Sequence, residues 1–109
     1  MITADGVKVG VMLAQQASQE YFRTQMSGQD RYPCGFAWVE VYVDRTNSVQ
    51  SKELIRSGFK KDYKPKCLTL WNPGDLPVQN VDAKEVGAQV MAQYLQSLGL
   101  KAYACSRLD

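Results

Sequence analysis

Residue types that commonly perform catalysis or bind metals are few in this chain, and they are scattered. The sequence of 109 residues contains no histidine, which removes Ser-His-Asp and Cys-His catalysis in cis and the commonest zinc ligand. The carboxylates Glu40, Asp44 and Asp82 lack a spacing that would pair two acids around a substrate. We therefore expect no catalytic residue, no metal site and no cofactor, and an enzyme is the weakest hypothesis.

The three cysteines, Cys34, Cys67 and Cys105, are widely spaced and form no CxxC pair. An odd number at such spacing argues against a disulfide framework, a zinc ribbon or a redox motif. A lone cysteine without a neighbouring base is also a poor nucleophile. We expect three reduced thiols that behave as small hydrophobic side chains.

Composition is that of an ordinary globular domain, with 45% apolar and 22% charged residues. The length predicts one domain over residues 1–109. A net charge of +2 does not by itself indicate nucleic acid. No apolar run is long enough to span a bilayer and no signal peptide is recognisable, so a cytoplasmic protein without membrane contact is expected.

The segment GFAWVEVYVD, residues 35–44, is the strongest strand signal in the chain. Alternation places Ala37, Val39 and Val41 on one face, suited to packing under helices, and aromatic side chains with Glu40 on the other. Together with two residues from later strands, this second face collects five aromatic residues that we predict as a binding surface: Phe36, Trp38, Tyr42, Trp71 and Tyr103.

A large aromatic face needs an explanation, because monomers rarely leave such a patch uncovered. Three explanations stay open: the N-terminal helix folds across it, a second copy covers it in a homodimer, or it binds a ligand. Stacking of unpaired bases on sheet aromatics is one such use, with phosphate contacts from Lys60–Lys66. The absence of an RNP1 pattern makes nucleic acid a less favoured alternative.

The remaining elements follow from periodicity, caps and turns. Asp82 with Glu85 three residues later forms a predicted capping box at the start of the last helix, and Asn72-Pro73-Gly74-Asp75 suits a type II turn. In chain order we expect a loose lead-in at 1–7, a helix over 9–26 that packs on the sheet, an α/β body over 34–109, a helix near 49–57, an edge strand near 59–63 and strands at 67–71 and 101–105.

This order predicts an α+β fold with a small sheet and helices. Two arrangements remain open. One is a ferredoxin-like βαββαβ unit preceded by an N-terminal helix. The other is a three-stranded sheet of βαβ units, if 59–63 is not a strand.

The loops and the C-terminal tail provide a second candidate surface. If strands 36–43 and 67–71 are parallel, loops 44–48 and 72–81 meet at one end, where free backbone N–H groups could hold an anion. The alternative is that these residues only cap helices and form turns. The polar residues in question are Arg45, Asn72, Gln79, Asn80 and Lys84, with Arg107 and Asp109 in the tail.

Four short segments, CGFAWV (34–39), LWNPG (70–74), QNVD-KE (79–85) and SRLD (106–109), give the chain a resemblance to small uncharacterised proteins of tailed bacteriophages. The likeness spans residues 34–109 and leaves out the N-terminal helix. That set of proteins has no established activity, so the resemblance implies a context: an intracellular accessory or host-interacting protein made during infection.

Taken together, these features predict a small non-enzymatic binding or assembly protein of phage type, with a homodimer and a host or phage protein as expected partners. Two alternatives come from other classes. One is a single-stranded nucleic-acid binder that uses the aromatic face and Lys60–Lys66. The other is a small anionic-ligand binder or enzyme at the helix N-termini.

Overall fold

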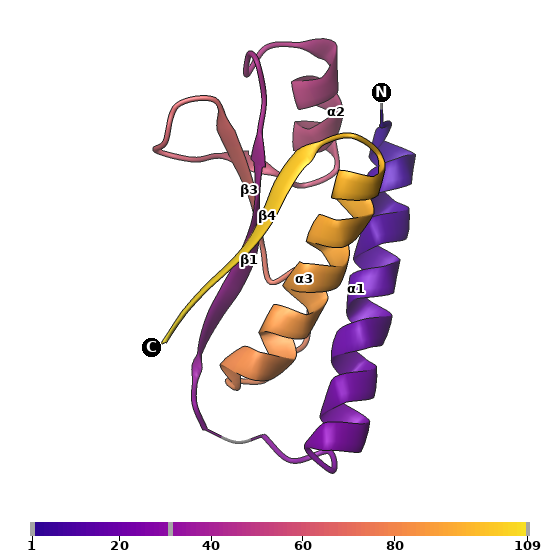
Figure 1. Ribbon diagram of the computed structural model, residues 1–109, viewed down its shortest axis with the longest axis vertical. Helices are drawn as coiled ribbons and strands as arrows, with labels where there is room; N and C mark the ends of the chain where they lie inside the picture. The colour runs from indigo at the N-terminus through magenta and orange to yellow at the C-terminus, as the bar shows by residue number, and fades with distance from the viewer. Residues whose placement is uncertain (1, 31, 109) are drawn as a thin grey trace.

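The computed structural model describes residues 2–30 and 32–108, which form three helices and four strands. Figure 1 shows their arrangement. In chain order the elements are α1 (Ala4–Gln25), β1 (Gly35–Tyr42), α2 (Val49–Arg56), β2 (Lys60–Lys61), β3 (Cys67–Trp71), α3 (Val81–Ser97) and β4 (Lys101–Leu108).

The four strands form one antiparallel sheet in the order β2-β3-β1-β4. The expected α+β class and the weak strand after Phe59 are therefore confirmed, the strand being only two residues long. The ferredoxin-like arrangement is not confirmed. The alternative, a three-stranded sheet of βαβ units, is wrong, because neighbouring strands in such a sheet are parallel whereas β1 and β3 run antiparallel, with Trp38 opposite Trp71 and Tyr42 opposite Cys67.

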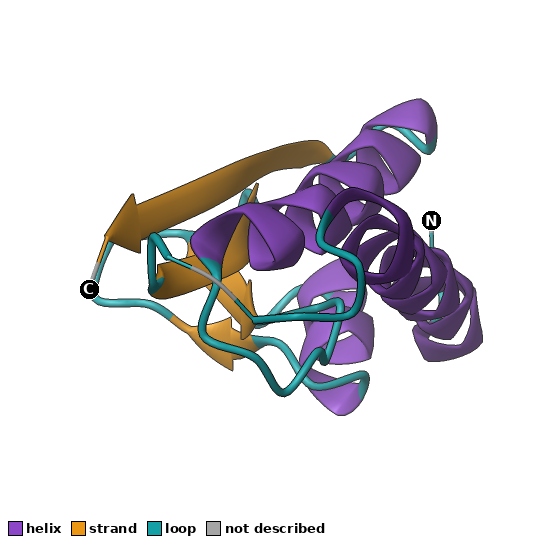
Figure 2. Ribbon diagram, turned by 90° about the horizontal axis from the view of Figure 1, so that it is seen from below, coloured by secondary structure: helices purple, strands orange, loops and turns teal. Residues whose placement is uncertain are grey.

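The helices lie on one side of the sheet. α3 packs directly against β1 and β4, and α1 packs along the outer side of α3 (Figures 1 and 2). The prediction that the N-terminal helix packs on the sheet is thus wrong, and α1 does not cover the aromatic face. The layers are sheet, α3 and α1. The aromatic residues of β1 alternate with the buried Val39 and Val41, so they lie on the side of the sheet away from α3.

A stripe of small residues explains why α1 docks on α3. Val7, Gly10, Ala14 and Ser18 recur at helical spacing and are buried. A Cβ atom at Gly10 would lie 2.6 Å from Met91 Sδ and 2.7 Å from a Tyr94 ring carbon, so the helices approach too closely for a larger residue. Leu13, which lies outside this stripe, is exposed.

The N-terminal segment is part of the fold and not a loose lead-in. α1 begins at Ala4, five residues before the predicted Val9, because the Thr3 hydroxyl accepts a hydrogen bond from Gly6 N. Ile2 is buried, and its backbone exchanges two hydrogen bonds of 2.9 Å with the Gln50 side chain on α2.

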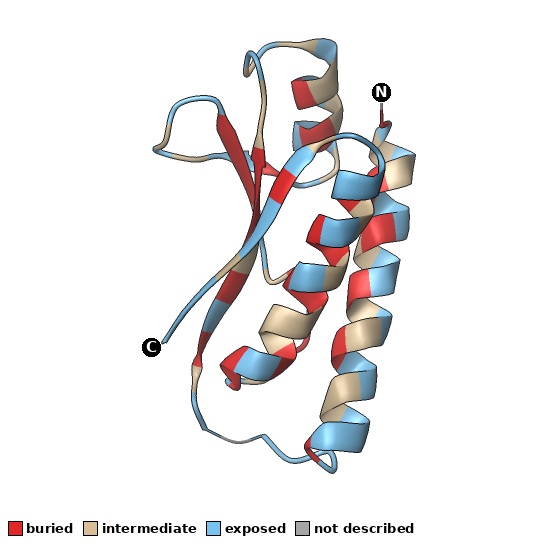
Figure 3. Cartoon of the chain, in the orientation of Figure 1, coloured by how far each residue is buried: buried red, intermediate tan, exposed pale blue. Residues whose placement is uncertain are grey.

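The hydrophobic core lies between the sheet and α3, where the buried positions gather in Figure 3. Val39 and Val41 of β1 are fully buried, together with Leu68 of β3 and Leu95 of α3. The alternation predicted for β1 is therefore correct on its core side. Within the described ranges, no helix combines the length and apolarity needed to cross a bilayer.

Two local predictions near α3 are corrected. The N-cap of α3 is Asn80 and not Asp82: the Asn80 side chain accepts a 2.9 Å hydrogen bond from Ala83 N. The turn 72–75 closes through a 2.8 Å bond from Asp75 N to Asn72 O. Gly74 does not have the positive φ of a type II turn; it is required instead because a Cβ atom would collide with Ser18 of α1.

The last strand is longer than predicted. β4 continues past Cys105 to Leu108 and pairs with β1 along its whole length, which sets Arg107 opposite Phe36. Arg107 is thus a strand residue and not part of a free tail. Asp109, the other predicted tail residue, lies outside the described residues.

Candidate functional site

The five predicted aromatic residues lie together on the side of the sheet away from α3, which we call the open face. Strand register brings them together, since Trp38 is opposite Trp71 and Tyr103 is opposite Glu40. Trp38 and Trp71 stack with ring centroids 4.9 Å apart and planes at 24°. Phe36 meets Trp71 edge-on at 6.1 Å, and Tyr42 meets Tyr103 edge-on at 5.9 Å.

Several of these rings remain open to solvent. Trp71 is 51% exposed and Tyr103 is 52% exposed. A stack in which the outer ring keeps half its surface free can accept a further planar group on that ring. Because no described helix covers this face, the aromatic cluster is available to a ligand.

Glu40 lies at the centre of the open face, between the two aromatic groups, and is 5% exposed. Its carboxylate accepts hydrogen bonds from Trp38 Nε1 at 3.1 Å and from the Tyr42 hydroxyl at 2.9 Å. Lys64 Nζ donates to both of its oxygens, at 3.0 and 3.3 Å. The carboxylate therefore fixes the indole of Trp38, the phenol of Tyr42 and the loop that carries Lys64.

The charges of this pair stabilise each other. Burial alone would raise the pKa of Glu40, but the hydrogen bonds from Trp38, Lys64 and Tyr42, with the Lys64 charge, hold that pKa below its ordinary value. The hydrogen bond to Glu40 raises the pKa of Lys64. At neutral pH both groups are ionised, and the buried carboxylate is neutralised by Lys64.

A cleft of about 300 Å³ opens beside this pair, at the lower end of the size range for small-ligand sites. The stacked tryptophans and Arg107 contribute to its walls, and the loop between β2 and β3 contributes Tyr63 and Lys64. Glu40 and Thr69, neighbours in the β1–β3 register, also line it. Asp62 lines it as well, so the cleft is aromatic and polar at once, with both cationic and acidic groups at its margin.

Cationic side chains surround the aromatic cluster. Lys84 Nζ and the Arg107 guanidinium each lie 5.4 Å from the centre of the Phe36 ring. Lys101 is opposite Tyr42, and Lys60 is opposite Thr69, so both project on the open-face side of the sheet. We call Lys60, Lys84, Lys101 and Arg107 the basic rim.

One group of side chains could be considered as metal ligands. Donor atoms of Glu40, Asp62 and Cys67 lie within 4.8 Å of one another. However, the Glu40 carboxylate already forms an ion pair with the Lys64 ammonium, and burial raises the pKa of the Cys67 thiol to about 11. A protonated thiol and a paired carboxylate are poor ligands, so the arrangement does not favour a metal. All three cysteines are free thiols, as predicted.

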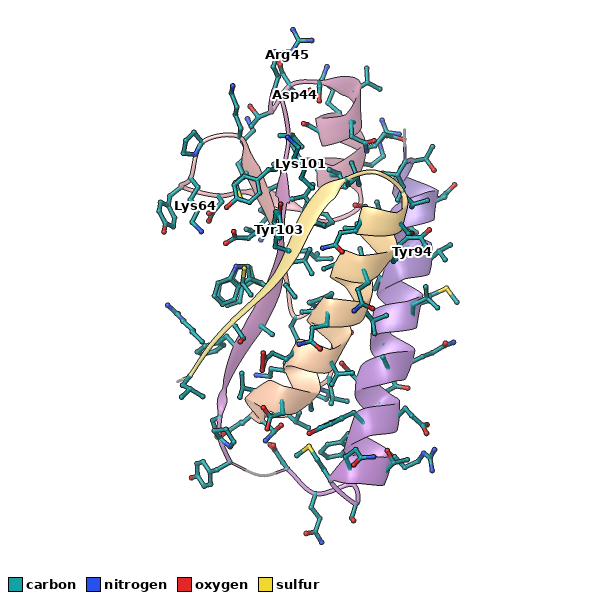
Figure 4. All side chains as sticks on the ribbon, in the orientation of Figure 1. Asp44, Arg45, Lys64, Tyr94, Lys101 and Tyr103 are labelled. Carbon is teal, nitrogen blue, oxygen red and sulfur yellow. The ribbon has the colours of Figure 1, made fainter. Side chains whose placement is uncertain are left out.

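The two loops predicted to form one anion site lie at opposite ends of the sheet, because β1 and β3 are antiparallel. Figure 4 shows Asp44 and Arg45 beyond the end of β1, and Lys64 and Tyr103 on the open-face side of the sheet. At the other end, Gln79 N and Asn80 N donate to the Asp30 carboxylate at 2.8 and 3.0 Å. An internal carboxylate therefore already occupies the backbone N–H groups before α3.

The other predicted loop residues have structural partners. The Asn72 side-chain amide donates to Leu76 O at 3.4 Å, the Gln79 side chain accepts from the Cys34 thiol at 3.4 Å, and Lys84 donates to Gly35 O at 2.9 Å. Of this second set, Lys84 and Arg107 join the open face through Phe36, whereas Arg45 does not.

Sequence reasoning missed the roles of Tyr63 and Asp30, and it did not pair Lys64 with Glu40. Tyr63 and Lys64 lie in the lysine-rich stretch read as phosphate contacts. A possible signal was Glu40 itself, a single acid within an aromatic alternation, because a buried carboxylate needs a cationic partner. Which lysine reaches it depends on the path of the loop.

Comparison of the chain with known protein families, with curated proteins and with solved structures finds no match. The resemblance to phage proteins stays a prediction.

Proposed function

We propose that the protein is a non-enzymatic binding protein for single-stranded nucleic acid, with bases on the open face and phosphates on the basic rim. The observation that carries this proposal is the exposed Phe36–Trp71–Trp38 cluster with Lys84 and Arg107 beside it. Such binding needs only an uncovered sheet face, so it does not depend on a ferredoxin-like chain path.

Unpaired bases stack on aromatic side chains whatever their sequence, and each such contact is worth about 1–3 kcal/mol. Four-stranded sheets whose aromatic residues stack two or three bases are one established means of binding RNA. Here two aromatic groups, one around Trp71 and one around Tyr103, are available along the same face. A base pair in a duplex has its faces buried in the stack, so single strands are the preferred substrate.

The rim provides the charge that such a ligand requires. Lys60, Lys84, Lys101 and Arg107 attract a phosphate backbone, and Glu40 does not repel it because Lys64 neutralises the carboxylate. An open aromatic face with a cationic margin fits an anionic, planar ligand better than an apolar one.

A second copy of the protein on the open face, as in a homodimer, stays a prediction. Face-to-face packing across a two-fold axis would bury the aromatic rings, but it would also set the basic rims of two copies against each other. Like charges brought together in this way cost free energy, whereas an anionic ligand gains from the same charges. We therefore favour nucleic acid over self-association.

Arg107→Gln tests the proposal against a matched control. Affinity for a fluorescein-labelled single-stranded DNA of about 12 nucleotides is measured between about 50 and 200 mM salt. Arg107→Gln should weaken binding and lower the slope of log K against log salt by about 0.7, the value for one phosphate contact. Arg23→Gln, on the outer part of α1 and 71% exposed, should leave both unchanged. Equal effects of the two variants would overturn the proposal.

A further inference from the structure

The loop between β2 and β3 has a feature that the proposed function does not use. Tyr63, in this loop, is 90% exposed, yet it lines the same cleft as Trp71. A tyrosine left almost entirely in water forgoes the free energy that burial of its ring would bring. Its place at the margin of an aromatic cleft suggests a ring that becomes buried only when the cleft is filled.

The backbone of this loop is fixed at its base. Asp62 N donates to Cys67 O at 3.0 Å, and Val43 N donates to Lys66 O at 2.9 Å. The residues between these bonds are held over the open face by the Lys64 side chain, which reaches Glu40 in the centre of β1. The ion pair thus determines where the neighbouring Tyr63 lies.

Glu40 and Lys64 differ in how deeply their side chains are buried. The Glu40 side chain is 6% exposed and the Lys64 side chain 39% exposed. Loss of Lys64 leaves a buried carboxylate without its counter-charge, which is strongly unfavourable. A phosphate therefore does not readily draw Lys64 away from Glu40. This makes Lys64 a positioning residue for the loop and a poor candidate for a phosphate contact.

We propose that Tyr63 and Trp71 are the two sides of a clamp that holds one base of a single-stranded nucleic acid in the cleft, and that the Glu40–Lys64 pair positions Tyr63 for it. This inference rests on the proposed function and adds to it a binding residue, Tyr63, and a separate role for Lys64. The loop is then a part of the binding site, with the sheet providing the other part.

The first arm of the test removes the Tyr63 ring. Tyr63→Ala should weaken binding of the labelled single strand by about tenfold, within the range for loss of one stacking contact, and Tyr63→Phe should restore it. The matched control is Tyr32→Ala, since Tyr32 is equally exposed at 88% but lies in the loop before β1 and does not line this cleft. Wild-type affinity of Tyr63→Ala would overturn the clamp.

The second arm separates positioning from phosphate contact. Lys64→Met should weaken binding without changing the salt slope, whereas loss of a phosphate contact lowers that slope by about 0.7. Without ligand, it should also shift tryptophan emission, because Glu40 holds the Trp38 indole. The control Lys61→Met, on the exposed strand β2, should change neither the affinity for the single strand nor the tryptophan emission. If Lys64→Met reduced the salt slope as much as Arg107→Gln does, the positioning role would be overturned. A wild-type protein that binds no single strand would overturn the proposed function as well.

Discussion

Trp38 and Trp71 stack at 4.9 Å on the open face of the sheet, and they are the two tryptophans of the chain. The antiparallel register of β1 and β3 sets them directly opposite each other. The Trp38 indole N–H donates a hydrogen bond to the Glu40 carboxylate, and Trp71 keeps half of its surface exposed. Intrinsic tryptophan fluorescence therefore reports on the candidate site alone.

Glu40 should make the protein sensitive to acid. Its pKa is lower in the folded protein than its ordinary value of 4.5, so its ionised form stabilises the fold above that value, and the contribution is lost as pH falls through the folded pKa. Glu40→Gln should flatten the fall of Tm below pH 4.5, measured by circular dichroism. The control Glu20→Gln, on exposed α1, should retain the wild-type dependence. An unchanged acid profile in Glu40→Gln would show that the pair is not formed in solution.

Asn80 is the residue that starts α3, and its replacement should lower stability. Asn80→Ala removes the acceptor for Ala83 N and should cost about 1 kcal/mol in the free energy of unfolding. Asp82→Ala is the control, because Asp82 lies within the first turn, where a carboxylate stabilises the helix through its dipole by about 0.3 kcal/mol. Urea unfolding of both variants measures the difference, and a larger loss in Asp82→Ala would return the cap to the residue expected from sequence.

Ser18 and Gly74 form a close contact that locks the turn before α3 against α1. A Cβ atom at Gly74 would lie 2.8 Å from Ser18 Cβ and closer still to its hydroxyl, so Gly74→Ala should cost about 1–3 kcal/mol. Ser18→Gly makes room for that Cβ, and the double variant should lose less stability than the sum of the single variants. Additive losses in urea unfolding would mean that the two residues do not meet.

The local elements could be predicted from sequence because their signals are local. The alternation of Ala37, Val39 and Val41 identifies β1 and its core face, and the helix predicted near 49–57 agrees with α2, which Ser48 caps. The composition of the aromatic face follows from the same alternation. The cap of α3 was misplaced by two residues because Asn80 and Asp82 are both good N-caps, and only the backbone path distinguishes them.

The relations between elements could not be predicted in the same way. The direction of β3 relative to β1 depends on how the chain returns after α2, and sequence periodicity carries no information on that path. α1 presents two stripes, one with larger side chains at Met12 and Leu13 and one with small residues at Gly10 and Ala14. Close packing on α3 selects the small stripe, although the other is more hydrophobic. The Lys64–Glu40 pair joins residues 24 positions apart, so it too depends on the loop path.

Titration of the unlabelled single strand into the wild-type protein, followed by tryptophan fluorescence at low salt, tests the central claim most directly. A base that stacks on Trp71 should quench the emission in a saturable manner, and about 200 mM salt should weaken the effect steeply. Trp71→Ala should lose affinity by about tenfold, measured with the labelled strand. Emission that does not change up to a large excess of single strand, with the protein folded by circular dichroism, would contradict the account.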